Sequence, residues 1–172
     1  MTRLGQYGSY LLLTVMVLLS GCKISYRFNG ASIDYTKTRT ISIADFPNHA
    51  ALVYPALSND LSEALRDLFA RQIRLEQVPQ AGDLEIEGEI TGYQLTPMAV
   101  AADSYAAETK LTITVKMRFT NHVTPSESFE RSYSAYQTFD ASRLLTDVQE
   151  ELCATMITEL TESIFNDTVA KW

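Results

Sequence analysis

The sequence predicts an α+β fold, a two-layer sandwich in which two helices cover one face of a mainly antiparallel sheet. Two segments, residues 84–93 and 111–120, alternate cleanly between apolar and polar residues, which is typical of half-buried strands, and a third strand is indicated at residues 129–136. Two longer segments carry apolar residues at three- and four-residue spacing, the pattern of an amphipathic helix. The predicted order is β-α-β-β-β-α, and the single apolar face of such a sheet needs the helices to cover it.

The first predicted strand spans residues 39–46, where Ile41 and Ile43 alternate with polar side chains. A helix is expected to begin near Ser58, with Asp60 and Glu63 forming a capping box. Its apolar stripe consists of Leu61, Ala64, Leu65, Leu68, Phe69 and Ile73.

Three strands are predicted next, over residues 84–93, 111–120 and 129–136. In the first, glutamates and a threonine alternate with apolar residues, and Gly88 and Gly92 are expected on the apolar side. The second and third are joined by a short connection containing Pro125, so they are expected to form a hairpin.

The last helix is predicted from about residue 145 to residue 169, with Thr146 as its N-cap and Gln149 closing a capping box. Cys153 falls on its apolar side and is interpreted as a small buried hydrophobe. The segment 96–109 is a long connection between two strands, either an interaction loop or a plain crossing.

The N-terminus resembles the leader of an exported protein. Residues 11–19 are apolar except for one threonine, and this stretch is too short to span a bilayer as a helix. Leu19-Ser20-Gly21-Cys22 then matches a bacterial lipobox. Cys22 of this motif is expected to carry covalent diacylglyceryl and N-acyl groups, such as palmitate. Several acyl chains would anchor the protein stably, since one acyl chain alone anchors a protein only marginally. The alternatives are an uncleaved signal anchor and a plain secreted protein.

These features divide the chain into a lipoprotein signal peptide (residues 1–21), a lipidated tether (22–37) and one α+β domain (38–172). A thioether at Cys22 would exclude a disulfide with Cys153. Lys23 follows the cysteine where some bacteria use aspartate to retain lipoproteins at the inner membrane, so the outer membrane, on its periplasmic face, is the expected location.

Composition and charge restrict the functions of the domain. Apolar residues make up 46% of the chain and charged residues 20%, as in globular proteins. Cleavage would remove Arg3, the single charged residue of the leader, and change the net charge from −7 to −8. This balance argues against general nucleic-acid binding, which requires Lys and Arg to neutralise phosphates.

The residues carry little that resembles an active site, and we expect no enzymatic activity, no metal and no cofactor beyond the acyl groups. His49 and His122 have no neighbour at metal-ligand spacing. The acidic row of Glu85, Glu87 and Glu89 is interpreted as a solvated sheet face.

Basic residues gather in two adjacent strands, and they have two interpretations. They could meet lipid phosphates, or they could pair across the sheet with the glutamate row, and the second interpretation is favoured. The residues concerned are Lys110, Lys116, Arg118 and Arg131.

The mature chain resembles the LptE family of lipopolysaccharide-assembly lipoproteins, in its Bacteroidetes form. The resemblance covers nearly the whole mature domain. Its matching stretches are the lipobox, residues 40–48, residues 83–93 (DLEIEGEITGY), residues 111–116 with 119–121, the strand at Phe129, and residues 164–172.

The resemblance implies an outer-membrane protein that plugs an LptD β-barrel, helps it fold, and helps deliver lipopolysaccharide to the cell surface. It also implies contact with lipopolysaccharide through basic side chains, for which Lys116, Arg118 and Arg131 are candidates chosen by charge alone. The alternative is a lipid-anchored periplasmic binding module for a small ligand or peptidoglycan.

Overall fold

A computed structural model describes residues 33–98 and 107–170 of the chain. The signal peptide, Cys22 and most of the predicted tether and interaction loop therefore lie outside the described residues. The elements are β1 (Thr40–Ile43), α2 (Leu57–Gln72), β2 (Glu76–Gln77), β3 (Leu84–Pro97), β4 (Glu108–Asn121), the 3-10 turn η1 (Pro125–Glu127), β5 (Phe129–Asp140) and α3 (Leu145–Thr168).

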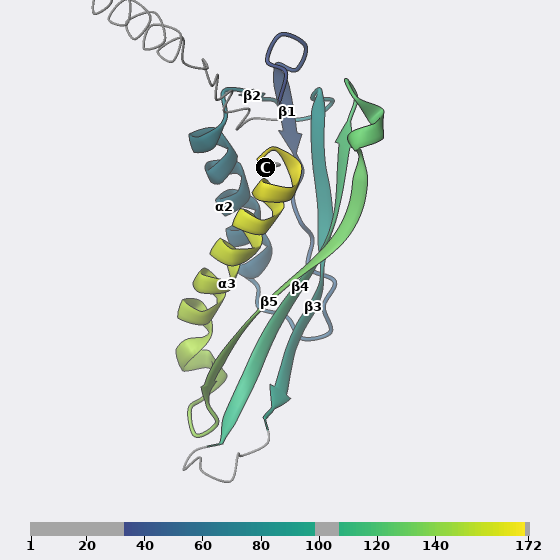
Figure 1. Ribbon diagram of the computed structural model, residues 1–172. Helices are drawn as coiled ribbons and strands as arrows, with labels where there is room; N and C mark the ends of the chain where they lie inside the picture. Colours follow the sequence, from purple (N-terminus) through teal and green to yellow (C-terminus); the bar gives the residue numbers. More distant parts are fainter. Residues whose placement is uncertain (1–32, 99–106, 171–172) are drawn as a thin grey trace, which may run out of the picture.

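The predicted two-layer α+β sandwich is confirmed. The five strands form one sheet in the order β2-β1-β3-β4-β5, with β3, β4 and β5 antiparallel and β1 parallel to both of its neighbours. Both helices lie against the same face of this sheet (Figure 1). The predicted hairpin joins β4 to β5 through η1. Within the described part of the chain, no helix is long and apolar enough to cross a membrane.

The core lies between the helices and the alternate strand residues that face them. Every second residue of β4 from Leu111 to Phe119 is buried, and the stripe Leu57, Leu61, Leu65 and Phe69 of α2 is fully buried opposite. The ring of Phe69 meets Phe165 of α3 edge-on, with centroids 5.0 Å apart, and so joins the two helices.

Both predicted capping boxes are wrong. Helix α2 begins at Leu57 with Ala56 as its N-cap, and the Ser58 hydroxyl instead donates to the carbonyl of Phe46 at 2.6 Å. Helix α3 begins after Leu144, and the Thr146 hydroxyl bonds Asp147. Neither helix has a side-chain cap, because α2 and α3 begin before Asp60 and Thr146, which therefore lie inside the first turn of their helices.

The prediction for Gly92 is also wrong. The register between β3 and β4 shifts between Ile90 and Gly92, so a bulge at Thr91 turns Gly92 to the face away from the helices. Gly88 does lie on the helix side, where a Cβ would come within 2.5 Å of the Phe46 ring. The two-residue strand β2 was not predicted, since two residues are too few to show alternation.

Candidate functional site

The face of the sheet that the helices leave open carries a ladder of charged side chains across β3, β4 and β5. Register places Glu87 of β3 opposite Arg118 of β4, which in turn lies opposite Glu130 of β5. One step along, Glu89 lies opposite Lys116. Strand alternation sends all five side chains to the same side.

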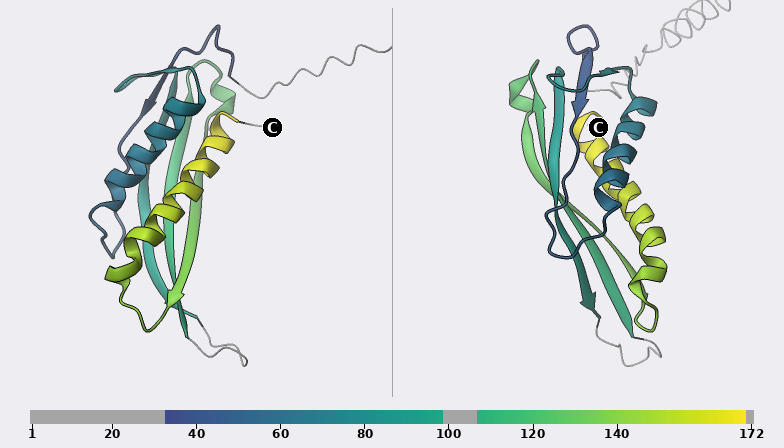
Figure 2. Two further views of the ribbon diagram at one scale, coloured as in Figure 1. Left: turned by 90° about the vertical axis from the view of Figure 1, so that its left-hand side faces the viewer. Right: turned by 180° about the vertical axis from the view of Figure 1, so that it is seen from behind.

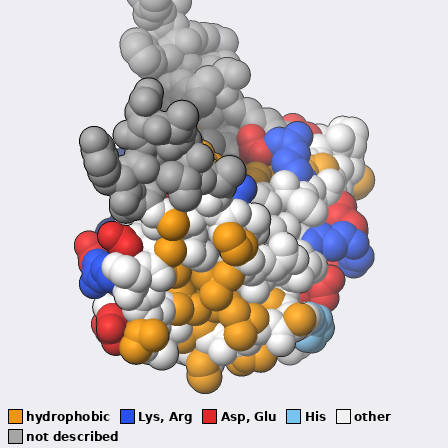
Figure 3. All heavy atoms as spheres, turned by 90° about the horizontal axis from the view of Figure 1, so that it is seen from below, with side chains coloured by type: hydrophobic (Ala, Val, Ile, Leu, Met, Phe, Trp, Pro, Cys, Tyr) orange, Lys and Arg blue, Asp and Glu red, His pale blue; other side chains and the backbone are white. Residues whose placement is uncertain are grey.

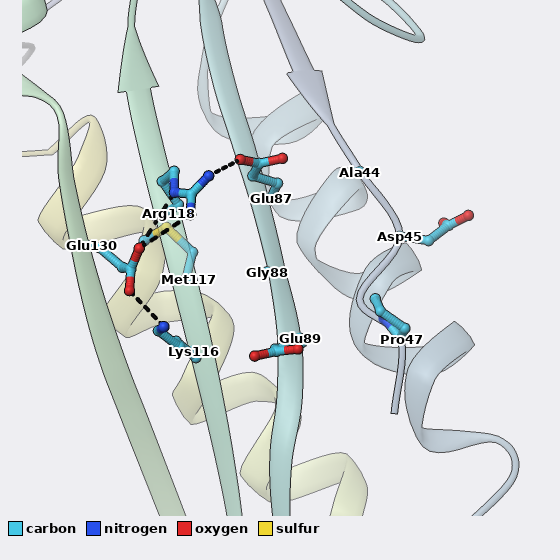
Figure 4. A pocket seen from close by; sticks show the side chains of 10 residues that line it. All are labelled: Ala44, Asp45, Pro47, Glu87, Gly88, Glu89, Lys116, Met117, Arg118 and Glu130. Atoms are coloured by element: carbon cyan, nitrogen blue, oxygen red, sulfur yellow. Dashed lines mark hydrogen bonds and ion pairs between the residues drawn. The ribbon is translucent and has the colours of Figure 1, made fainter. Parts of the chain in front are cut away.

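The cations of the ladder are held by carboxylates (Figure 4). Arg118 donates to Glu87 at 3.0 Å and to Glu130 at 3.4 Å, while Lys116 Nζ lies 2.7 Å from Glu130 Oε1. The bond and charge of Glu130 raise the pKa of Lys116 above its ordinary value, and Lys116 in turn lowers the pKa of Glu130. Arg118 therefore pairs across the sheet with the glutamate row as expected, whereas Lys116 pairs with Glu130 of β5, which is outside that row.

The two histidines are partners of the other two glutamates of β3. His122 Nε2 lies 3.0 Å from Glu85, and His49 Nδ1 lies 2.8 Å from Glu89. Each glutamate predicted to face solvent therefore has a basic partner. The alternation of β3 predicted the glutamate row, but His49 comes from the segment after β1, whose path no periodicity reveals.

A shallow hollow of about 370 Å³ opens over this ladder. The segment after β1, with Asp45 and Pro47, forms one wall, and Glu130 stands at the other (Figure 4). Asp45 is paired with Arg66 of α2. The side chains of Lys116 and Arg118 are 48% and 58% exposed and so can be reached from the hollow. An anionic ligand that binds them there must displace the carboxylates that hold them.

The structure does not bring Arg131 together with Lys116 and Arg118. Arg131 lies opposite Met117, whose side chain is buried beneath the helices, so Arg131 extends to the helix side of β5. There its guanidinium pairs with Asp167 of α3, which also accepts a hydrogen bond from the Tyr133 hydroxyl at 3.0 Å. Lys110 lies over the ring of Tyr136, 5.4 Å from its centroid.

The end of the sandwich at which β3 ends and α3 begins, at the bottom of Figure 1, has exposed apolar side chains. Helix α2 spans about 24 Å and the long strands about 46 Å, so α2 covers only part of their length. Seen from below, apolar side chains gather on the surface (Figure 3). The exposed large apolar residues of the segment before α2, of the end of β3 and of the residue before α3 are Leu52, Val53, Leu95, Met98 and Leu144, between 40% and 68% exposed. The first described residues lie at the opposite end (Figure 1).

No three His, Cys, Asp or Glu side chains of the described residues stand close enough together to hold a metal ion. Cys153 is buried beside the Tyr93 hydroxyl, 3.9 Å away, and burial raises the pKa of its thiol. The interpretation of Cys153 as a buried small residue is confirmed.

A model of one protein family, described as "LptE: Lipopolysaccharide-assembly", matches residues 38–168. Among curated proteins, none matches the chain. Solved structures similar to this chain include a minor lipoprotein from Acinetobacter baumannii (14% identity, 74% of this chain and 89% of that chain, TM-score 0.48). Another is the rare lipoprotein B from Shewanella oneidensis (10% identity, 75% and 90%, TM-score 0.46).

Proposed function

Because the chain belongs to the LptE family of lipopolysaccharide-assembly proteins, we propose that it is an outer-membrane lipoprotein that partners an LptD-type β-barrel. In this role it acts as plug and assembly factor in the transport of lipopolysaccharide to the cell surface. The carrying observation is the family match, which runs from just before β1 to the last residue of α3 and so includes the whole sandwich.

Anchoring is the first part of the proposal. Cys22 follows small residues at the end of an apolar leader, and acyl groups on it would hold the chain at the periplasmic face of the outer membrane. The tether up to residue 37 joins the domain at the end that carries the start of β1. Among the described residues, the opposite end of the sandwich lies away from this attachment and can face a partner.

The exposed apolar end supports a protein partner. Single exposed apolar residues are ordinary, but a contiguous patch is typical of a surface that another molecule covers. Leu144 and Val53, in the segments before α3 and α2, are 68% and 61% exposed. Fitting this end into a barrel lumen would remove the patch from water, and it requires shape and packing rather than catalysis or a cofactor.

Contact with lipopolysaccharide is assigned in this proposal to Lys116 and Arg118. Both point from β4 into the hollow on the open face, where a phosphate group could replace Glu87 or Glu130 as their partner. Arg131 is left out of this pair because Asp167 holds it on the other side of the sheet. The alternative of a small-ligand module gains no support from the hollow, whose lining residues include no aromatic ring.

Affinity purification of the tagged, full-length chain from detergent-solubilised membranes tests the proposal. We expect a large β-barrel to co-purify in equal amount, and Cys22→Ser to lower the recovery of that complex from the outer membrane. Recovery of the chain with periplasmic enzymes and without any barrel would contradict it.

A further inference from the structure

We propose that the outer edge of β5 binds an extended segment of the partner protein by β-strand addition, at residues 132–138. β5 is the last strand of the sheet, and none of the described strands pairs with its outer edge. The left-hand view of Figure 2 shows it at the margin of the sheet, with α3 over its face rather than beside its edge. The inference rests on the proposed function for the identity of the partner.

The other open edges of this sheet carry features that block pairing. β2, at the far edge, has only two residues, one of them Glu76. The free part of β3 is broken by the bulge at Thr91 and ends in Pro97, which has no N–H to donate. These are the devices by which sheets avoid joining other chains.

β5 has none of these devices over its central residues. It pairs with β4 along 12 residues without a register shift. Residues 132–138 read Ser-Tyr-Ser-Ala-Tyr-Gln-Thr, with no charge, proline or glycine. A long, regular and uncharged edge of this kind is a template for another strand.

Strand geometry shows which backbone groups are available. On β3, residues facing the helices direct their backbone groups away from β4, as the bonds from Ala44 to Ile86 and from His49 to Ile90 show. In a strand, residues on one face direct their backbone N–H and C=O groups to one side, and residues on the other face direct them to the other side. Followed from β3 through β4 to β5, this pattern makes the open-face residues of β5 direct their backbone groups to the outer edge. Ser132, Ser134, Tyr136 and Thr138 therefore present N–H and C=O groups at the edge.

The neighbouring side chains suit a strand with uncharged residues. Ser134 bonds Thr114 across the sheet at 3.0 Å, and Tyr136 beside it is 61% exposed. Lys110 lies over one face of the Tyr136 ring, and a β-branched or aromatic residue on the incoming strand could pack against the part of the ring that Lys110 leaves open. The bonds from Tyr133 to Asp167 and from Gln137 to Glu159 lie on the helix side and leave the edge open.

Charge favours a different protein over a second copy of this chain. Each copy carries a net charge of −7 before processing, so two copies repel one another. A closed barrel has no free strand of its own. The incoming segment therefore belongs to a loop or terminal extension of the barrel protein, outside its closed ladder.

The test measures how much barrel protein co-purifies with each tagged, full-length variant, compared with the tagged wild-type chain. Ser134→Pro removes an outward N–H, whereas Ser134→Ala keeps it. Ser134→Lys adds a charge at the edge, and Thr114→Lys adds the same charge one strand further in. Thermal melting of each purified variant checks that it folds.

We expect Ser134→Pro and Ser134→Lys to lower the recovered barrel by about tenfold, because a lost bond or a buried charge disrupts the pairing, while both controls keep it. Wild-type recovery from folded Ser134→Pro and Ser134→Lys would overturn the inference and leave the proposed function standing. A wild-type chain without a barrel would overturn both. Sedimentation as a dimer that Ser134→Pro dissociates would overturn the inference in favour of a second copy.

Discussion

Arg131 of β5 pairs with Asp167 of α3 on the helix side of the sheet, opposite the face that carries the other two candidate cations. The Asp167 carboxylate also accepts a hydrogen bond from the Tyr133 hydroxyl, and burial, together with this bond and the charge of Asp167, raises the pKa of Tyr133. Asp167 thus ties the edge strand to the last turns of α3. The role of Arg131 is structural in this arrangement.

Replacing Arg131 should lower stability and leave glycolipid binding unchanged. Arg131→Ala removes a partly exposed ion pair, so we expect a loss of about 0.2–1 kcal/mol in the free energy of unfolding. Urea denaturation measures it, and Asp167→Ala with the double variant completes a cycle. If the folded Arg131→Ala chain bound lipopolysaccharide more weakly than wild type, Arg131 would contribute to glycolipid binding and the prediction would be contradicted.

Neutralising Glu130 should strengthen binding of lipopolysaccharide at the open face. Glu130→Gln frees Lys116 and Arg118 from their shared carboxylate, whereas Lys116→Gln removes a cation. We expect tighter binding for the first variant and weaker binding for the second, with both effects shrinking at high salt. Isothermal titration with purified lipopolysaccharide measures them, and equal affinities in all three proteins would exclude the ladder as a contact site.

Adding a methyl group at Gly88 should be far more harmful than at Gly92. A Cβ at Gly88 would lie 2.5 Å from both the Lys116 carbonyl oxygen and the Phe46 ring, and the backbone atom cannot yield. We expect Gly88→Ala to cost about 1–3 kcal/mol or more. Gly92→Ala serves as the control, since its nearest contact is the Thr114 side chain at 3.1 Å. Equal melting temperatures for the two variants would contradict the register of β3.

The carboxylate of Asp83 should make the start of β1 sensitive to acid. It accepts the backbone N–H groups of Arg39 at 2.7 Å and Thr40 at 3.0 Å, and these bonds lower its pKa below the ordinary 3.8. Its contribution is therefore complete above the unfolded pKa and is lost as the pH falls through the folded value. Asp83→Asn should melt below wild type at pH 7, with the difference closing in strong acid. A pH-independent difference would contradict this origin.

Cys153 should react with a thiol reagent only after unfolding. The side chain is 1% exposed and burial raises its pKa, so both access and thiolate are scarce in the native state. Colorimetric labelling at pH 8, with and without urea, measures this. Labelling of the native chain at the unfolded rate would show that α3 opens readily from the sheet.

Alternation and helical spacing were enough to predict the sandwich, because they record which residues face the core. They placed Leu61 and Phe69 of α2, and the whole inward row of β4, correctly. The N-caps were missed because each helix begins before its capping motif, with Ala56 and Leu144 at the N-cap positions. The bulge at Thr91 was missed for a related reason, since one inserted residue leaves the surrounding alternation intact.

The charged residues were predicted less completely than the core. The sequence showed that glutamates and cations would oppose one another across β3 and β4, as they do at Glu87 and Arg118. Alternation already placed Arg131 on the same face as Phe129 and Tyr133, and this arginine was grouped with Lys116 and Arg118 by charge alone. Nothing in the sequence indicated that His49 would reach Glu89 from outside the sheet.

Depletion of the chain from growing cells tests the central claim most directly, with lipopolysaccharide at the cell surface as the measured quantity. The account predicts that surface lipopolysaccharide falls while its precursors accumulate inside, and that the wild-type gene restores it but Cys22→Ser does not. Unchanged surface lipopolysaccharide after complete depletion would contradict a role in its transport.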